Sequence, residues 1–404
     1  MKKIQLFVLT LLFLLLATPL LAFDLAESLQ IHGFVSQGYM SSSNNNFLTE
    51  SRSGSYEFTD LGLNLNWMAL DNLRLGGQAF YRNLGNYSED NITLDWALVD
   101  YQPSDWLGVR LGKVKMPLGL YNETRDSDFL QPMIFLPQSI YDESRRDTNL
   151  AYIGGGLYGN LPVGSWGDID YHVFTGESTY PDDSILTQST NNSISESIRK
   201  NKTNPLLPDS FESSERKSDG LYGGAIVFNS AAHDLRLGFS LFRSKNNVYV
   251  NGSSTPLMEN TVKRKFVFSL EYLWRDWMFV SEYGETDRKT SQAGKVTMDG
   301  PSQSWYVMLS YAPFERWTFT VLYDEFYRLK YDRDGSTKPQ SPSYTAWRKD
   351  LGGAIRYEIN DDWVLKAEYH YIDGSAMQLN VVNPDKAYPD RYWSYFAAKL
   401  SYSF

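Results

Sequence analysis

Apolar and polar residues alternate along much of the chain, and the last segment shows this most clearly. Phe396, Ala398 and Leu400 occupy every second position there, and Lys399 and Ser401 belong to the alternate set of positions. Successive side chains of an extended strand point to opposite faces, so this alternation predicts a strand with one apolar and one polar face. The same pattern recurs in residues 61–67, 235–241, 266–274 and 365–371.

Segments of this kind recur through the whole chain and are about ten residues long, the length of a tilted strand that crosses a bilayer. We expect about sixteen strands, an even number, as bacterial outer-membrane barrels have. The predicted strands cover residues 28–40, 59–69, 73–84, 92–101, 106–115, 150–160, 168–176, 220–229, 235–244, 264–275, 277–286, 303–312, 317–328, 347–359, 363–373 and 392–404.

The connections between these segments alternate between short and long. The short ones, rich in turn-forming residues, are residues 70–72, 102–105, 275–276, 313–316 and 360–362. Between them lie polar stretches of the kind that form the extracellular loops of a barrel. These predicted loops are residues 41–56, 177–218, 245–262, 287–302, 329–346 and 374–391.

The polar faces of the predicted strands carry charges such as Lys366 and Glu368. A soluble barrel fills its interior with apolar side chains, whereas a membrane barrel turns them to lipid and keeps charges around water. Aromatic residues make up 15% of the chain and cluster near segment ends, where a bilayer interface would hold them. The sequence therefore predicts an all-β fold, a transmembrane antiparallel β-barrel.

The first residues have the features of a secretory signal peptide. Lys2 and Lys3 precede an apolar stretch, residues 4–17, and cleavage after Ala22 would leave 404 minus 22, or 382, residues. An uncleaved membrane anchor is the alternative. We expect residues 1–22 to be the signal and residues 23–404 to form the barrel, because no later apolar run is long enough for a spanning helix.

Composition narrows the function classes. The chain has 0 Cys, which excludes thiolate metal sites, disulfides and a lipid-anchored cysteine. Its net charge of -10, or -12 without Lys2 and Lys3, argues against a nucleic-acid partner and is compatible with a surface facing lipopolysaccharide through divalent ions. We expect no cofactor.

Residues 116–149, after the fifth predicted strand, form a long connection that is not purely hydrophilic. It contains the apolar run 133–136, which favours partial burial. Folded inward, it would narrow the lumen and hold charges of both signs near the passage; an ordinary surface loop is the alternative. Its candidate constriction residues are Arg125, Asp126, Asp128, Glu143, Arg145 and Arg146.

Cations also fall on predicted inward positions of the strands. They would attract phosphate or carboxylate solutes, but Glu271, Asp324, Glu358 and Glu368 share those faces, so a selective anion channel remains an alternative to a general pore. The candidate lining residues are Arg74, Arg82, Arg110, Lys113, Lys115, Arg236, Arg348, Arg356, Lys366 and Lys399.

Other functions have weaker support in the sequence. His32, His172, His233 and His370 lie on distant segments and suggest no metal or catalytic motif, so an enzyme would need a Ser-His or Asp-His arrangement formed in space. An adhesion barrel using residues 177–218 is a third class, but the Ser and Asn content of this stretch indicates a flexible loop.

Two stretches resemble the Gram-negative porins, including their phosphate-selective group. Residues 112–123, Gly-Lys-Val-Lys-Met-Pro-Leu-Gly-Leu-Tyr-Asn-Glu, look like the region that opens the internal loop, and Phe404 with Tyr402 looks like the C-terminal assembly signal. The resemblance implies a porin of sixteen strands, usually trimeric, inserted by the barrel-assembly machinery, with the loop after strand five as constriction for passively diffusing hydrophilic solutes. The mixed charges depart from the basic lumen expected of phosphate-selective members.

Overall fold

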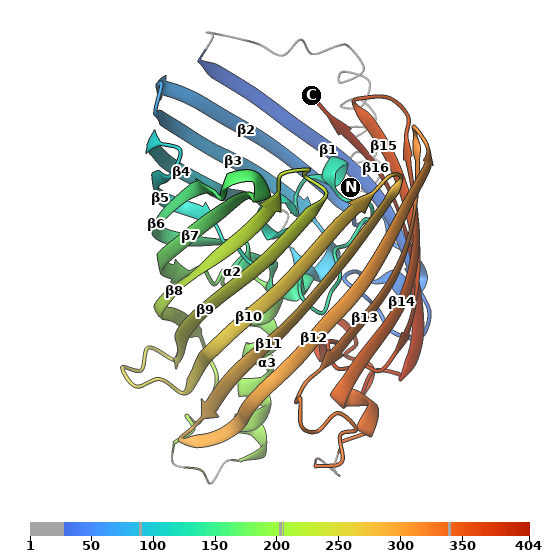
Figure 1. Cartoon of the computed structure of the whole chain (residues 1–404). Helices are drawn as coiled ribbons and strands as arrows, with labels where there is room; N and C mark the ends of the chain where they lie inside the picture. The colour runs from blue at the N-terminus through green and yellow to red at the C-terminus, as the bar shows by residue number, and fades with distance from the viewer. Residues whose placement is uncertain (1–27, 89–90, 202–203, 205, 338–340) are drawn as a thin grey trace.

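The computed structural model describes residues 28–88, 91–201, 204, 206–337 and 341–404. The expected signal peptide lies outside the described residues. In the described part, sixteen strands form one closed antiparallel barrel in which each strand pairs with its neighbours in the sequence (Figure 1). The strands are β1 (Leu29–Ser42), β2 (Thr59–Leu70), β3 (Leu73–Asn83), β4 (Ile92–Ser104), β5 (Leu107–Lys115), β6 (Ala151–Pro162), β7 (Gly167–Ser178), β8 (Ser214–Ser230), β9 (Leu235–Val250), β10 (Met258–Trp274), β11 (Trp277–Gln292), β12 (Lys295–Phe314), β13 (Trp317–Tyr327), β14 (Trp347–Glu358), β15 (Trp363–Asp373) and β16 (Tyr392–Ser403).

The first and last strands close the barrel. β1 and β16 pair from Phe34 opposite Ser403 to Ser42 opposite Tyr395. Beyond this ladder, Gly33 N donates to Phe404 O at 3.1 Å and Phe404 N donates to Gly33 O at 3.0 Å. Each predicted strand coincides with an observed one, so the expected fold class and strand number are confirmed.

The two faces of the wall have the predicted polarity. Leu63, Leu65 and Trp67 of β2 are exposed on the outside, whereas Asp60 of the same strand and Gln78 of β3 are buried inside. Outward apolar side chains and inward polar ones are the arrangement of a barrel surrounded by lipid. The predicted inverted pattern is therefore present.

The barrel has a turn end and a loop end. At the turn end, strands are joined by short connections such as residues 71–72, 275–276 and 315–316, close to the predicted turns. The loop end carries the longer connections and helix α3 (Ile185–Lys200). The remaining helical elements are α2 (Arg146–Asn149) and the 3-10 turns η1 (Ser51–Ser53), η2 (Gly85–Tyr87), η3 (Asn122–Thr124), η4 (Asp128–Leu130), η5 (Glu143–Arg145), η6 (Gly164–Trp166), η7 (Ser343–Ala346) and η8 (Asn380–Val382).

Two predicted loops are wrong because the strands continue through them. Of residues 287–302, only Ala293 and Gly294 lie between β11 and β12, and both have positive φ, at 47° and 73°. Residues 245–262 are likewise mostly β9 and β10. Beyond the predicted strand ends these hairpins are rich in polar residues on both faces, so no apolar alternation marks them as strands.

The prediction of a flexible loop at residues 177–218 is also wrong, because this stretch contains helix α3. Ser184 caps this helix: its hydroxyl accepts a hydrogen bond from Thr187 N at 3.3 Å. Ile194 and Ile198 are buried with Val248, so the helix is packed against the extended hairpin. Within the described ranges, no helix is long and apolar enough to cross a membrane.

Candidate functional site

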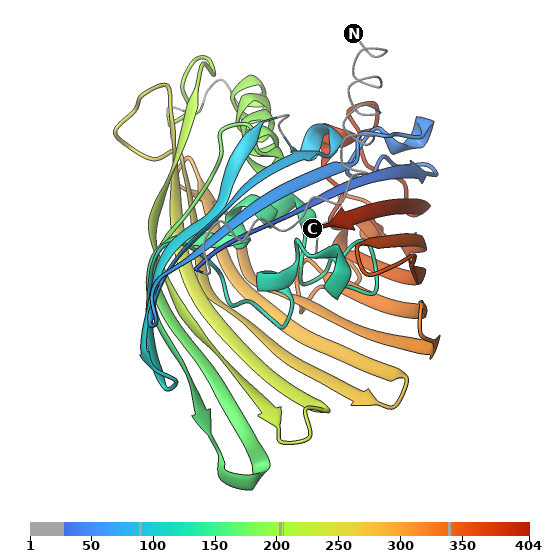
Figure 2. The same ribbon diagram turned by 90° about the horizontal axis from the view of Figure 1, so that it is seen from above.

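Residues 116–149, called the internal segment from here on, lie inside the ring of strands when the barrel is seen from above (Figure 2). Their backbone bonds to wall residues far away in the sequence. Gly119 N donates to Ser240 Oγ of β9 at 3.1 Å, and Ser139 N donates to Asp324 Oδ2 of β13 at 3.2 Å. Ile134 N donates to Glu368 Oε2 of β15 at 2.8 Å.

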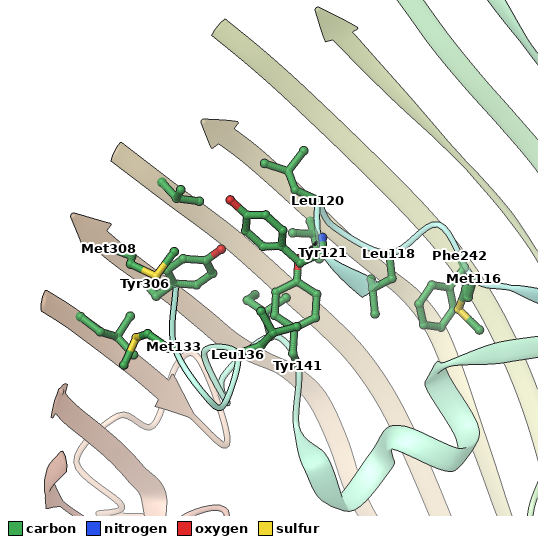
Figure 3. Packing of buried hydrophobic residues seen from close by; sticks show 14 of the residues in the cluster. Met116, Leu118, Leu120, Tyr121, Met133, Leu136, Tyr141, Phe242, Tyr306 and Met308 are labelled. Atoms are coloured by element: carbon green, nitrogen blue, oxygen red, sulfur yellow. Dashed lines mark hydrogen bonds between the residues drawn. The ribbon is translucent and has the colours of Figure 1, made fainter. Parts of the chain in front are cut away.

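Apolar side chains of the internal segment pack against the wall formed by β9 to β13 (Figure 3). Full burial of one large apolar side chain stabilises a fold by roughly 1.5–3 kcal/mol, so the cluster fixes the segment strongly. The burial expected for the run 133–136 is observed at Met133, Phe135 and Leu136. The cluster contains Met116, Leu118, Leu120, Tyr121, Met133, Leu136, Ile140 and Tyr141 from the segment, and Phe242, Val267, Val280, Tyr306, Met308 and Leu322 from the wall.

Glu282 of β11 is the polar anchor beneath this cluster. One carboxylate oxygen accepts hydrogen bonds from Leu120 N at 2.9 Å and from Ser269 Oγ at 2.5 Å, and the other accepts from Tyr306 OH at 2.9 Å. A buried carboxylate with several donors holds a backbone at a fixed place. Glu282 was not among the predicted site residues.

Arg146 binds the C-terminal end of the segment to the wall. Its guanidinium lies 2.7 Å from Asp95 of β4 and 2.7 Å from Asp126, and it also stacks 4.3 Å above the Phe80 ring. Lys115 reaches the same Asp126 at 2.9 Å. Burial alone would raise the pKa of the Asp126 carboxyl, but Lys115 and Arg146 outweigh it and hold that pKa well below its usual range.

A second ion-pair network surrounds Glu143. Its two oxygens lie 2.7 Å from Arg82 of β3 and 2.7 Å from Arg125. Burial by itself would raise the pKa of Glu143, but the Arg125 and Arg82 guanidinium groups lower it to about 2. The network continues through Asp60 to Lys399, which also contacts Asp128 at 2.9 Å.

The other predicted lining cations are also engaged. Arg356 Nη2 donates to Phe129 O, and Lys366 Nζ donates to Met133 O, both at 2.9 Å. Arg236 pairs with Glu271 at 3.1 Å, and Arg348 pairs with Asp324 at 2.9 Å. Most of the charges predicted to line the passage therefore bind the segment or one another.

Arg74 and Arg110 lie on the turn-end side of the segment and keep part of their side chains exposed. They share Asp100 at 3.0 and 3.2 Å, their side chains are 34% and 22% exposed, and Arg110 lies 3.8 Å from the Tyr158 ring centre. With Asp126, Asp128 and Phe129 they line a cavity of about 510 Å³ on the turn-end side of the segment.

Lys113 is a correction to the predicted lining. It pairs across the sheet with Ile153, whose side chain is exposed on the outside, and cross-strand partners share a face. Its ammonium donates to Leu94 O at 2.6 Å. Lys113 therefore belongs to the outward side of β5. Arg110 and Lys113 are three positions apart, so the strict alternation of a strand already places them on opposite faces, and the prediction of both as lining residues overlooked this.

A further group of cations lies on the loop-end side of the segment, around a small cavity of about 150 Å³. Arg145 was predicted to lie near the passage, but Arg216, Lys265 and Arg288 were not. Arg216 and Arg288 fall in stretches predicted as loops, so their place on strand faces could not be inferred. Lys265 lies within the predicted strand 264–275, on the same face as Ser269 and Glu271, so the alternating pattern could have placed it inside.

The structure also forms an Asp-His pair, the arrangement that an enzyme would require. His370 Nδ1 lies 2.9 Å from Asp350 Oδ1, and its ring stacks on Tyr395 at 4.3 Å. Nε2, the atom that would accept a proton from a nucleophile, has no hydrogen-bond partner among the described residues and lies 3.5 Å from Glu368. Among the described residues, no serine hydroxyl is hydrogen-bonded to this buried imidazole.

No protein-family model and no curated protein matches the sequence. Solved structures do match. OmpF of Salmonella typhi, in complex with daunomycin, aligns with a TM-score of 0.57 at 11% identity, over 93% of this chain and 97% of that one. The trimer form of in-vitro folded OmpT of Vibrio cholerae gives 0.55 at 12%, covering 93% and 99%, and the outer-membrane channel DcaP of Acinetobacter baumannii gives 0.54 at 11%, covering 93% and 97%. The chain thus has the fold of Gram-negative outer-membrane channel barrels.

Proposed function

We propose that this protein is an outer-membrane porin through which small hydrophilic solutes diffuse passively, and that the internal segment is its constriction. One observation carries the proposal. The internal segment lies inside a barrel whose inner wall is polar, and it is bonded to strands all around that wall, among them β3, β9 and β16. A segment that is fixed inside the lumen fills part of it and leaves a narrow path for solutes. We infer no enzymatic activity.

The path would run beside the segment through the cavities at its two sides. The turn-end cavity of about 510 Å³ contains Arg74 and Arg110, and a loop-end cavity of about 620 Å³ contains Arg145 and Asp142. Charges of both signs at the walls would let solutes exchange part of their water for hydrogen bonds.

The cellular setting follows from the same proposal. The exposed apolar wall would contact lipid, and the loop end would face lipopolysaccharide on the cell surface. The solved trimer form of OmpT favours a homotrimer here as well. The pairing of Phe404 with Gly33 at the barrel closure is where recognition by the barrel-assembly machinery would act.

Single-channel current in a planar bilayer tests this function. We expect stepwise openings of the purified protein, and larger steps when residues 118–147 are replaced by a short Gly-Ser linker, because the segment no longer narrows the lumen. A matched control shortens residues 251–257, the hairpin tip between β9 and β10 at the same end, and should leave the step size unchanged.

Two outcomes would contradict the proposal separately. A correctly folded protein that carries no current would refute the pore, and equal steps with and without the internal segment would refute the constriction. The sign of the reversal potential in a salt gradient would then assign cation or anion preference.

A further inference from the structure

The charged residues that line the small cavity beside the internal segment are all cations. Four cations surround it: Arg145 of η5, Arg216 of β8, Lys265 of β10 and Arg288 of β11. None of its described lining residues is Asp or Glu. These cations come from four separate elements, so the cavity is formed by the tertiary fold.

The pairing of these cations differs from that elsewhere in the lumen. The side chains of Lys265 and Arg288 form no ion pair and no hydrogen bond among the described residues, and the Lys265 ammonium lies 5.6 Å from the centre of the Phe242 ring. Arg216 donates to Thr190 Oγ1 at 2.6 Å, while its Nε is buried without a partner. Arg145 reaches only Asp142, at 3.4 Å.

Removing a cation from bulk water without a compensating anion costs free energy. Arg82, Arg125 and Arg146 avoid this cost because each lies 2.7 Å from a carboxylate. The buried Nε of Arg216 is a free donor at the cavity. A ligand with several anionic oxygens would supply the missing acceptors.

The neutral lining and the size suit a compact ligand. Asn246, Asn260, Ser244 and Thr286 add hydrogen-bonding groups to the four cations. A volume of about 150 Å³ holds roughly five waters at about 30 Å³ each. A tetrahedral oxyanion, with five heavy atoms, fits this space.

The cavity adjoins the larger loop-end cavity of about 620 Å³, and Arg145, Lys265 and Arg288 line both. The described carboxylates that line the larger cavity each have a cationic partner. Glu285 pairs with Lys330 and Glu196 with Lys200, both at 2.6 Å, and Asp142 pairs with Arg145 at 3.4 Å. An anion entering the larger cavity would therefore meet Lys265 and Arg288, which have no carboxylate partner among the described residues.

We propose that the cavity lined by Arg145, Arg216, Lys265 and Arg288 binds a small multivalent oxyanion of the phosphate type. This inference rests on the proposed function, because the site would load an anionic solute on its way through the pore. The ligand is a soluble anion, because the cavity shares Arg145, Lys265 and Arg288 with the larger loop-end cavity, which the internal segment borders.

Thermal unfolding of the purified protein in detergent tests the site without requiring conduction. Inorganic phosphate should raise the unfolding temperature beyond chloride at equal ionic strength, because a ligand of the native state stabilises it. Lys265→Gln and Arg288→Gln should each weaken the apparent phosphate affinity at least tenfold. In phosphate-free buffer neither substitution should lower the unfolding temperature, because each removes an uncompensated cation.

Lys263→Gln is the matched control on the same strand. Lys263 is exposed and pairs with Asp299 at 2.6 Å, so its loss changes the net charge equally and should leave phosphate affinity intact. Equal losses in Lys263→Gln and Lys265→Gln would overturn the site, as would a wild type that phosphate does not stabilise beyond chloride. A shift produced by phosphatidic acid in the micelles, but not by inorganic phosphate, would overturn its assignment to a soluble anion.

This assay separates the two proposals. Stepwise current without phosphate stabilisation would refute the anion site and keep the porin. Phosphate stabilisation of a protein that never conducts would refute the porin and keep an anion-binding barrel.

Discussion

Arg146 shows how a charge placed near a passage can serve a structural purpose. It joins Asp95 of the wall to Asp126 of the internal segment and is itself almost fully buried. Removing one partner of such a pair leaves an uncompensated buried charge, which costs about 3–5 kcal/mol. The lumen thus contains cations whose carboxylate partners hold the segment, and others, such as Lys265 and Arg288, whose side chains form no ion pair among the described residues.

Glu143 gives a prediction for acid stability. Its pKa is lowered from 4.5 to about 2, so its ion pairs contribute in full above pH of about 4.5 and are lost as pH falls toward 2. Glu143→Gln should reduce the free energy of unfolding at pH 7, and the gap to the wild type should close by at most about 3 kcal/mol between these values. Urea titrations of the refolded wild type and variant at each pH measure this difference in the free energy of unfolding.

The control for this titration is Glu212→Gln. Glu212 is exposed and forms no ion pair among the described residues, so the substitution should leave the pH profile of the wild type unchanged. A gap between Glu143→Gln and the wild type that persists undiminished at pH 2 would contradict the role assigned to Glu143.

Strands facing lipid could be predicted from sequence, and elements surrounded by water could not. In β2 the residues Leu63, Leu65 and Trp67 face lipid and must be apolar. Their spacing at every second position therefore reveals the strand in the sequence. The hairpin around Ala293 and Gly294 has no such requirement, and the sequence gives no apolar period there. Helix α3 was missed for a related reason: Ile194 and Ile198 are spaced along a Ser- and Asn-rich stretch whose composition resembles a loop.

The internal segment was predictable as a buried stretch but not in its contacts. Its apolar run and prolines indicate a place out of solvent. Its partners, however, are distant in sequence: Leu120 bonds to Glu282, and Asp128 bonds to Lys399. One sequence shows that charges exist on inward positions, but it does not show which of them meet.

Phe404 gives a prediction for the closing strands. Deletion of Phe404 removes two backbone hydrogen bonds to Gly33 and the aromatic ring that lies over that glycine. We expect several-fold less heat-modifiable, membrane-integrated protein, because the closure between β1 and β16 is weakened. Fractionation of outer membranes followed by unboiled gel electrophoresis measures the folded fraction.

Phe396→Ala is the control for that deletion. Phe396 lies on the same strand and is exposed outside, and its substitution keeps every backbone bond of the ladder. It should assemble at close to wild-type yield. Normal assembly without Phe404 would show that the C-terminal residue is dispensable.

The whole molecule combines an apolar exterior with a polar interior that is largely occupied. The strand ladders satisfy the backbone in a closed ring, as a bilayer requires. The internal segment then replaces much of the water that an empty barrel of this size would contain. What remains for solutes is set by the fit of this segment against the wall.

The attachment of the internal segment also fixes an order of events during assembly. The segment lies between β5 and β6, yet Asp128 binds Lys399 and Ser401 of β16, the last strand made. These two bonds can form only once β16 is in place, so we expect the segment to reach its final position no earlier than the last strand joins the ring. During refolding, protease protection of residues 116–149 should appear together with the heat-modifiable form; earlier protection would show that the segment locks before the barrel closes.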